Sequence, residues 1–205
     1  SREFFYPDIH HLHDPFLMID MDIVVDRILT TISSNKTILI FGDYDVDGTT
    51  AAAFLTLFFK SINIESHYYI PNRENEGYGL SNQGIDFAKY IGADILITCG
   101  CGINAYNEVA YANEKNIDVI ITDHHKADNN LPEALAIINP NRKDCDYPFK
   151  GLCGAGVVFK MALAICEKGG FDSEIVWKNS DIITLGIAAD LVPVKDENRI
   201  IAYHG

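Results

Sequence analysis

Apolar runs rich in β-branched residues recur along the first two thirds of the chain, each bounded by turn residues. Such runs are typical of strands buried on both faces, as in a parallel sheet covered by helices. We predict five of these strands, over residues 37–41, 64–70, 94–98, 117–122 and 134–138.

The segments between and after these strands predict helices. Residues 20–33 have the apolar spacing of an amphipathic helix, and further helices are predicted over 49–60, 82–91, 104–115, 154–168 and 173–189. Strands that alternate with helices predict an α/β fold, here a doubly wound, mainly parallel five-stranded sheet flanked by helices with right-handed crossovers. After residue 189 the pattern predicts no closing element.

Two polar stretches follow the first and fourth predicted strands. One reads DYDVDG and the other DHH, and their charged residues are Asp43, Asp45, Asp47, Asp123, His124 and His125. The loops at the carboxyl ends of parallel strands share one edge of the sheet, where ligands bind. Because so many carboxylates in one place need a cation, we expect a metal site at this edge.

The spacing of the three aspartates also opens the calcium loop of the EF-hand. That loop needs a bidentate Glu at its twelfth position, which here is Phe54, and a helix rather than a strand before it. Mg²⁺ or Mn²⁺ fits better, since hard cations prefer carboxylate oxygens and Mn²⁺ also accepts imidazole.

Asp190 is a third candidate for the metal site. It follows the last turn of a predicted helix, where the helix dipole disfavours a negative charge by a few tenths to about 1 kcal/mol. A carboxylate at that place, beside an apolar run, suggests a metal ligand. A solvated surface aspartate is the alternative.

Composition limits the classes of protein. The 205 residues are 48% hydrophobic, which fits one large domain with one substantial core. The formal net charge of −13 argues against a free-standing DNA-binding protein. Bound divalent ions could offset the site carboxylates, or a basic partner domain could lie outside this piece.

Cysteine usage and hydropathy bear on the compartment. The five cysteines form no CxxC pair, so they predict neither a disulfide framework nor a zinc ribbon, although Cys99 and Cys101 could bind metal. No stretch approaches the roughly 18 apolar residues of a membrane span, and no signal peptide opens the chain. We therefore expect a cytoplasmic location. The cluster of His10, His11 and His13 predicts an N-terminal extension that packs over the domain rather than a metal site.

Five motifs in order along the chain resemble one family. They are FGDYDVDGTT at 41–50, EGYGL at 76–80, TDHH at 122–125, GAGVVFK at 154–160 and ADLVP at 189–193. The chain is similar in these to the DHH phosphoesterase superfamily and, within it, to the RecJ-like exonucleases specific for single strands. The resemblance implies 5′→3′ exonuclease action on single-stranded DNA in repair and recombination.

The resemblance also implies roles for particular residues. Two divalent ions, Mn²⁺ or Mg²⁺, would be held by Asp43, Asp45, Asp47, His124 and Asp190, and two-metal hydrolysis would follow. Asp123 and His125 would orient and assist catalysis. Phosphate contacts are predicted for Arg73 and for the amides of Gly154, Ala155 and Gly156 at a helix N-terminus. A surface arginine and a tight packing turn are the alternatives.

One position departs from the family pattern. After the third strand the family has an Asp that bridges the two metals, followed by Cys-Gly-Ile or a near variant. Here residues 98–103 read TCGCGI, so Gly100 occupies the bridging position. Three interpretations compete: a substitution that traps an inactive form, a natural variant compensated by another ligand, or a non-catalytic relative. We favour a disabled or weakened nuclease because the other ligands are retained.

The resemblance implies further domains outside residues 1–205. We expect residues 1–205 to be a DHH catalytic domain without the C-terminal DHHA1-type and OB-fold domains. DNA would run between the two catalytic domains, so single-stranded DNA would bind mainly through the missing part. A single-strand-binding protein or a helicase is a further partner class, and the oligomeric state stays open.

Other functions on the same fold remain as alternatives. A non-catalytic replication or scaffold protein is one alternative, and Gly100 is the only feature that favours it. A phosphodiesterase for oligonucleotides or cyclic dinucleotides would usually carry a serine in the first motif. A soluble pyrophosphatase would have a histidine where Phe41 stands.

Overall fold

The computed structural model of the chain describes residues 5–34 and 36–205, and it contains one parallel sheet. The five strands are β1 (Ile38–Gly42), β2 (Ser66–Tyr69), β3 (Ile95–Cys99), β4 (Asp118–Thr122) and β5 (Ala136–Ile138). Their order in the sheet is β2-β1-β3-β4-β5, and all four pairings are parallel. The predicted fold class is confirmed.

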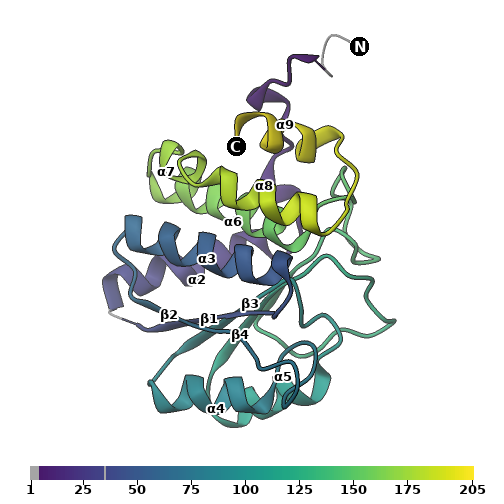
Figure 1. Cartoon of the computed structure of the whole chain (residues 1–205). Helices are drawn as coiled ribbons and strands as arrows, with labels where there is room; N and C mark the ends of the chain where they lie inside the picture. The colour runs from purple at the N-terminus through teal and green to yellow at the C-terminus, as the bar shows by residue number, and fades with distance from the viewer. Residues whose placement is uncertain (1–4, 35) are drawn as a thin grey trace.

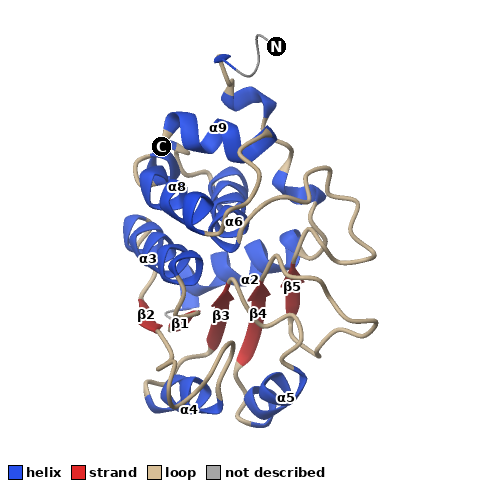
Figure 2. Ribbon diagram, turned by 45° about the vertical axis from the view of Figure 1, so that its right-hand side comes forward, coloured by secondary structure: helices blue, strands red, loops and turns tan. Residues whose placement is uncertain are grey.

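Helices cover both faces of the sheet, as Figures 1 and 2 show. One face carries α4 (Asn82–Tyr90) and α5 (Tyr106–Glu114). The other carries α2 (Met21–Ser34), α3 (Val46–Ser61) and α6 (Gly154–Gly169), with α7 (Glu174–Trp177), α8 (Ser180–Ala189) and α9 (Asp196–His204) beyond them. Two short 3₁₀ helices, η1 (Ile9–His11) and η2 (Pro15–Leu17), precede α2. None of the helices in the described ranges is long and apolar enough to cross a membrane.

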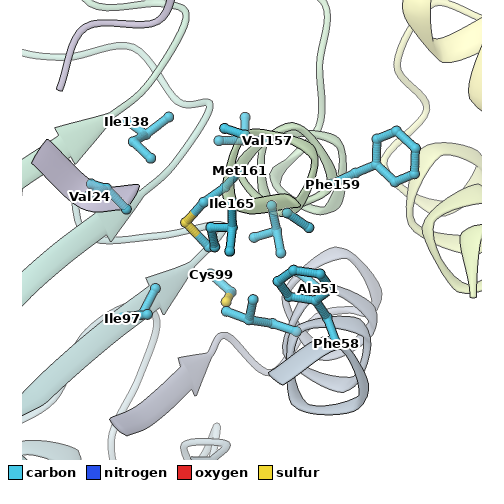
Figure 3. Packing of buried hydrophobic residues seen from close by; sticks show 14 of the residues in the cluster. Val24, Ala51, Phe58, Ile97, Cys99, Ile138, Val157, Phe159, Met161 and Ile165 are labelled. Carbon is cyan, nitrogen blue, oxygen red and sulfur yellow. The ribbon is translucent and has the colours of Figure 1, made fainter. Parts of the chain in front are cut away.

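Helix α6 lies at the centre of the larger core. It packs against α2, α3 and β3 on one side and α8 on the other, and Figure 3 shows Val157, Met161 and Ile165 of α6 in one cluster with side chains of α3 and β3. Every residue from Gly154 to Ala162 is buried. A helix that is apolar on nearly all sides is stable only when surrounded in this way, so α6 connects the sheet to the helices that follow it.

Helix α3 begins three residues earlier than predicted. The Asp45 side chain caps it, because its Oδ1 accepts a hydrogen bond from the Gly48 amide at 2.7 Å. An N-cap aspartate satisfies one of the free amides of the first turn. Asp47 therefore lies inside the first turn of a helix and not in a loop.

The predicted helix over 173–189 is in fact two helices. The backbone of Asn179, at φ −119° and ψ 24°, leaves the helical region between α7 and α8. Trp177 of α7 packs edge-on against Phe159 of α6, with 5.0 Å between the ring centroids. This contact holds α7 against α6 independently of α8. The expectation of no closing element is also wrong, since α9 follows. Its stabilising contacts are tertiary, so a local pattern could not show them.

A buried charged network attaches α9 to the rest of the protein. Lys160 and Glu197 are fully buried, with 2.6 Å between Nζ and Oε1. Glu197 also accepts hydrogen bonds from the Tyr147 hydroxyl at 2.6 Å and from the His13 amide at 3.1 Å. Lys160 donates in addition to the His13 carbonyl. The N-terminal extension therefore packs over the domain as predicted, and η1 contacts α9.

We predict that Lys160→Met lowers the free energy of unfolding by about 3–5 kcal/mol, because it leaves the Glu197 carboxylate buried without its cation. Lys168→Met on the same helix is the matched control. Lys168 pairs with Asp26, but the two side chains are 41% and 61% exposed, so this loss should stay below about 1 kcal/mol. Urea unfolding measures both, and equal losses would contradict the assignment.

Candidate metal centre

Three neighbouring strands end in register at one edge of the sheet. Gly42 of β1 lies beside Cys99 of β3, which lies beside Thr122 of β4. The next residues along the chain are Asp43, Gly100 and Asp123, and the Gly100 amide donates to the Thr122 carbonyl at 3.0 Å. The two polar stretches of the sequence therefore begin at the same edge, as the parallel pattern predicts.

Asp47 is held by the N-terminus of α6. The amides of Gly154 and Ala155 donate to its Oδ2 and Oδ1 at 2.7 and 2.9 Å, and the side chain is 4% exposed. Helix N-termini bind anions through such free amides and the helix dipole. A Cβ on Gly154 would lie 2.5 Å from Asp47 Oδ2. Only glycine allows this approach.

The amides predicted to bind phosphate thus have another acceptor. Those of Gly154 and Ala155 are occupied by Asp47, and Gly156 is buried one residue further into the helix. The phosphate contact of this segment stays a prediction, although two of its amides already bind a carboxylate of the same chain. The segment acts on the site indirectly, by fixing Asp47.

His124 lies between Asp47 and Asp190. Its Nε2 is 3.4 Å from Asp47 Oδ2, and its Nδ1 is 3.7 Å from Asp190 Oδ2. Ligand atoms of the three residues lie within 4.8 Å of one another, a spacing at which they could hold a metal ion. Asp190 is the C-cap of α8, as expected, and partial burial raises the pKa of its carboxyl. Three elements far apart in sequence meet here.

Asp43 is fully buried beside this cluster. Its Oδ1 accepts a long hydrogen bond of 3.4 Å from the Gly79 amide, and its Oδ2 has no hydrogen-bond partner among the described residues. Burial raises the pKa of the Asp43 carboxyl. A buried carboxylate oxygen without a donor is costly unless a cation satisfies it. Oxygen donors with one imidazole suit Mn²⁺ or Mg²⁺.

Asp123 is arranged differently, although it is just as buried. Its Oδ1 accepts from the His124 and His125 amides and from His125 Nδ1, at 2.7, 3.1 and 2.7 Å, and its Oδ2 accepts from the Ile103 amide at 2.9 Å. Burial alone would raise the pKa of Asp123, but hydrogen bonds from His125 and the amides lower it. The hydrogen bond to Asp123 raises the pKa of His125. Asp123 orients His125.

Asp45 and Arg73 lie outside the cluster. Asp45 is exposed and caps α3. Arg73 is exposed, with its guanidinium 5.4 Å from the centre of the Tyr44 ring. Tyr44 packs edge-on against Tyr78, whose hydroxyl lies 3.3 Å from His125 Nε2.

The sequence pattern alone did not indicate that Tyr44 and Tyr78 lie at the site. Tyr78 lines a cavity of about 240 Å³ together with Gly79, Ile103, Asp123 and His125. The only signal for Tyr78 was its place in the EGYGL motif.

The backbone at Gly100 leaves room for a side chain on the side that faces the cluster. Its φ is 74°, in the left-handed region, and a Cβ there would lie 3.4 Å from Asp47 Oδ2 and 3.7 Å from Gly48 Cα. These are ordinary contact distances. A side chain at position 100 would start toward Asp47, and Asp is one of the residues that tolerate this backbone region.

The two buried carboxylates predict opposite effects of the same substitution. In EDTA, Asp43→Asn should raise the free energy of unfolding by about 1 kcal/mol, because it removes a buried charge that lacks donors. Asp123→Asn should lower it by about 2 kcal/mol, because it disrupts charge-assisted hydrogen bonds. Urea unfolding without metal measures both. A comparable loss in the two variants would show that Asp43 is satisfied in the metal-free protein.

Comparison with known proteins agrees with this geometry. The family model described as "DHH family, N-terminal domain" matches residues 37–187. The chain is 40% identical over its whole length to the single-stranded-DNA-specific exonuclease RecJ of Bacillus subtilis (strain 168), covering 25% of that protein. It is 37% identical to the exonuclease of the same name from Salmonella typhimurium, with 90% of this chain aligned to 34% of that protein.

A solved structure shows the same fold. The crystal structure of exonuclease RecJ bound to manganese matches with a TM-score of 0.85 and 27% identity, over 97% of this chain and 49% of that one. The chain thus spans about a quarter to a third of the length of these curated relatives.

Proposed function

The chain belongs to the DHH family, and on that premise we propose that it is the catalytic domain of a metal-dependent 5′→3′ exonuclease acting on single-stranded DNA in repair and recombination. The observation that carries the proposal is the meeting of Asp47, His124 and Asp190 at the strand ends. The similarity to RecJ exonucleases supports the substrate.

We assign the ion as Mn²⁺ or Mg²⁺. Asp47, His124 and Asp190 would hold it, and Asp43, with its unpartnered buried oxygen, is a further proposed ligand. Asp45 remains a proposed ligand, since its cap uses one carboxylate oxygen only. A bound divalent ion would supply an activated water and neutralise charge on the phosphoryl oxygens.

The protein residues carry the rest of the mechanism. The amides of Gly154 and Ala155 hold the Asp47 carboxylate in place. Asp123 holds His125 through Nδ1, so that the opposite ring nitrogen, Nε2, is directed away from Asp123. Its raised pKa favours the protonated ring, which can donate a proton to a leaving oxygen. In this proposal Asp123 is a positioning residue and His125 the acid.

The surface beside the centre suits an unpaired strand. Tyr78 is 54% exposed, next to His125, and aromatic rings stack on bases of any sequence. Arg73 next to Tyr44 is the proposed phosphate contact. In a chain of net charge −13, acidic residues outnumber basic ones, so we assign further phosphate contacts to a basic domain outside residues 1–205, of the DHHA1 or OB-fold type.

The proposed function also implies protein partners and a cellular compartment. Single strands in cells are produced by helicases and covered by single-strand-binding proteins, so these are the proposed protein partners. All five cysteines are free and buried. Free thiols agree with the reducing cytoplasm, which we propose as the location.

Gly100 supports a second candidate, a non-catalytic member of the family. The position that would direct a carboxylate toward Asp47 carries no side chain. We nevertheless favour a disabled or weakened nuclease, because the chain retains the other proposed ligands and the Asp123–His125 pair. The two candidates differ in whether one carboxylate restores activity.

We predict that Gly100→Asp increases the release of nucleotides from 5′-labelled single-stranded DNA in Mn²⁺ at least about tenfold. Residues that only support metal ligands already change activity 10–100-fold, and a direct ligand should do no less. Gly100→Asn, which has the same shape without the charge, is the control and should stay at the starting level. Equal activity of all three proteins would show that position 100 is not needed for turnover. Activity in none would favour the non-catalytic candidate.

Asp190→Asn should raise the dissociation constant of Mn²⁺ at least about tenfold, measured by isothermal titration calorimetry, because it removes an anionic ligand. Asp181→Asn, in the exposed first turn of the same helix, should change it less than about twofold. If both variants bound Mn²⁺ as the unaltered chain does, the metal would not lie at Asp190.

A further inference from the structure

One buried amide side chain joins two loops that lead to the metal centre. Asn198, in the first turn of α9, is fully buried. Its Nδ2 donates hydrogen bonds to the Gly151 carbonyl at 2.7 Å and to the Pro193 carbonyl at 3.0 Å. Its Oδ1 has no hydrogen-bond partner among the described residues. The side chain is therefore held through its two N–H groups alone.

Each of these carbonyls lies a few residues from a component of the centre. Gly151 is two residues before Cys153, the N-cap of α6, whose first amides hold Asp47. Pro193 is three residues after Asp190, the C-cap of α8. Asn198 thus connects the loop that fixes one proposed ligand with the loop that carries another.

The loop after Asp190 needs such support. Leu191 adopts φ 54°, a left-handed conformation that is unfavourable for a branched side chain, and it is 89% exposed. Strained backbone persists only where its surroundings hold it. The Pro193 carbonyl accepts from both Asn198 Nδ2 and the Lys195 amide, so it is the point at which α9 holds this loop.

Helix α9, which carries Asn198, is itself held in place by a buried ion pair. Glu197, next to Asn198, is fully buried and pairs with Lys160 of α6. Helix α6 is also the helix whose N-terminal amides bind Asp47. The position of Asn198 is therefore set by the element that also sets Asp47.

We propose that Asn198 is a positioning residue of the metal centre, which fixes the separation of the Asp47 and Asp190 carboxylates by holding the Gly151 and Pro193 carbonyls together. The inference rests on the proposed metal-dependent function. It goes beyond it by assigning metal affinity to a residue that contacts none of the proposed ligands. A purely structural role, in which Asn198 only satisfies two buried carbonyls, is the competing explanation.

The test compares Asn198→Leu with Tyr147→Phe in the 205-residue chain. Leu has nearly the shape of Asn but donates no hydrogen bond, and it also removes the unpartnered Oδ1, so the fold should tolerate it. Tyr147→Phe deletes a buried hydrogen bond to Glu197 without touching either loop carbonyl. The thermal midpoint in EDTA reports stability for both, and titration calorimetry with Mn²⁺ reports affinity.

Asn198→Leu should raise the dissociation constant of Mn²⁺ about 10–100-fold, the range found for residues that orient metal ligands, and should alter the EPR spectrum of the bound ion. Tyr147→Phe should lower the thermal midpoint and leave affinity and spectrum unchanged. Equal affinities in all three proteins, or equal losses in both variants, would overturn the positioning role. Absence of Mn²⁺ binding to the unaltered chain would instead overturn the proposed function on which this inference rests.

A measurement on the unaltered chain does not depend on the folding of a variant. If the contact favours metal binding, metal binding must favour the contact by the same factor. Saturation with Mg²⁺ should therefore slow hydrogen exchange of the Asn198 side-chain amide in NMR spectra. The amide of Asn113, which donates to the Glu133 carbonyl on the opposite side of the sheet, is the reference. Unchanged exchange at Asn198 on saturation would contradict the proposal.

Discussion

The carboxylate of Asp47 at the N-terminus of α6 is the interaction on which the site depends. It joins the first turn of α3 to a helix that begins more than 100 residues later, through amide hydrogen bonds of 2.7 and 2.9 Å. The approach needs glycine at position 154, and a Cβ added at Gly100 would lie 3.4 Å from the same carboxylate. Helix α6 packs against both the sheet and α8. The position of Asp47 is therefore coupled to the positions of the elements that carry His124 and Asp190.

Three buried aspartates at this edge differ in how their charge is satisfied, and the difference separates their roles. Four donors surround Asp123, three of them at Oδ1, and this makes Asp123 the acceptor that orients His125. Asp47 has two amides and an imidazole nearby. Asp43 accepts a long hydrogen bond from Gly79, and its Oδ2 has no donor among the described residues. A cation is the partner that the last two lack, since unpaired buried charge is costly.

Much of this arrangement could be predicted from local sequence, and the remainder depends on distant contacts. The β-branched runs predict the parallel sheet, and the in-register strand ends bring residues 43, 100 and 123 together. The engagement of the Gly154 amide by Asp47 could not be predicted, because it joins residues 107 positions apart. Helix α9 was not predicted for the same reason. In the sequence Glu197 looks like an ordinary surface residue, and only the structure shows that it pairs with Lys160 in the core.

Locating the ion tests the central claim most directly. In crystals of the chain grown with Mn²⁺, anomalous scattering at the manganese absorption edge should give a peak within coordination distance of Asp47, His124 and Asp190. This result would agree with the spacing of these ligand atoms and with the unpartnered oxygen of Asp43. A peak at Asp123 and His125 instead, or no peak at this edge of the sheet, would contradict the account.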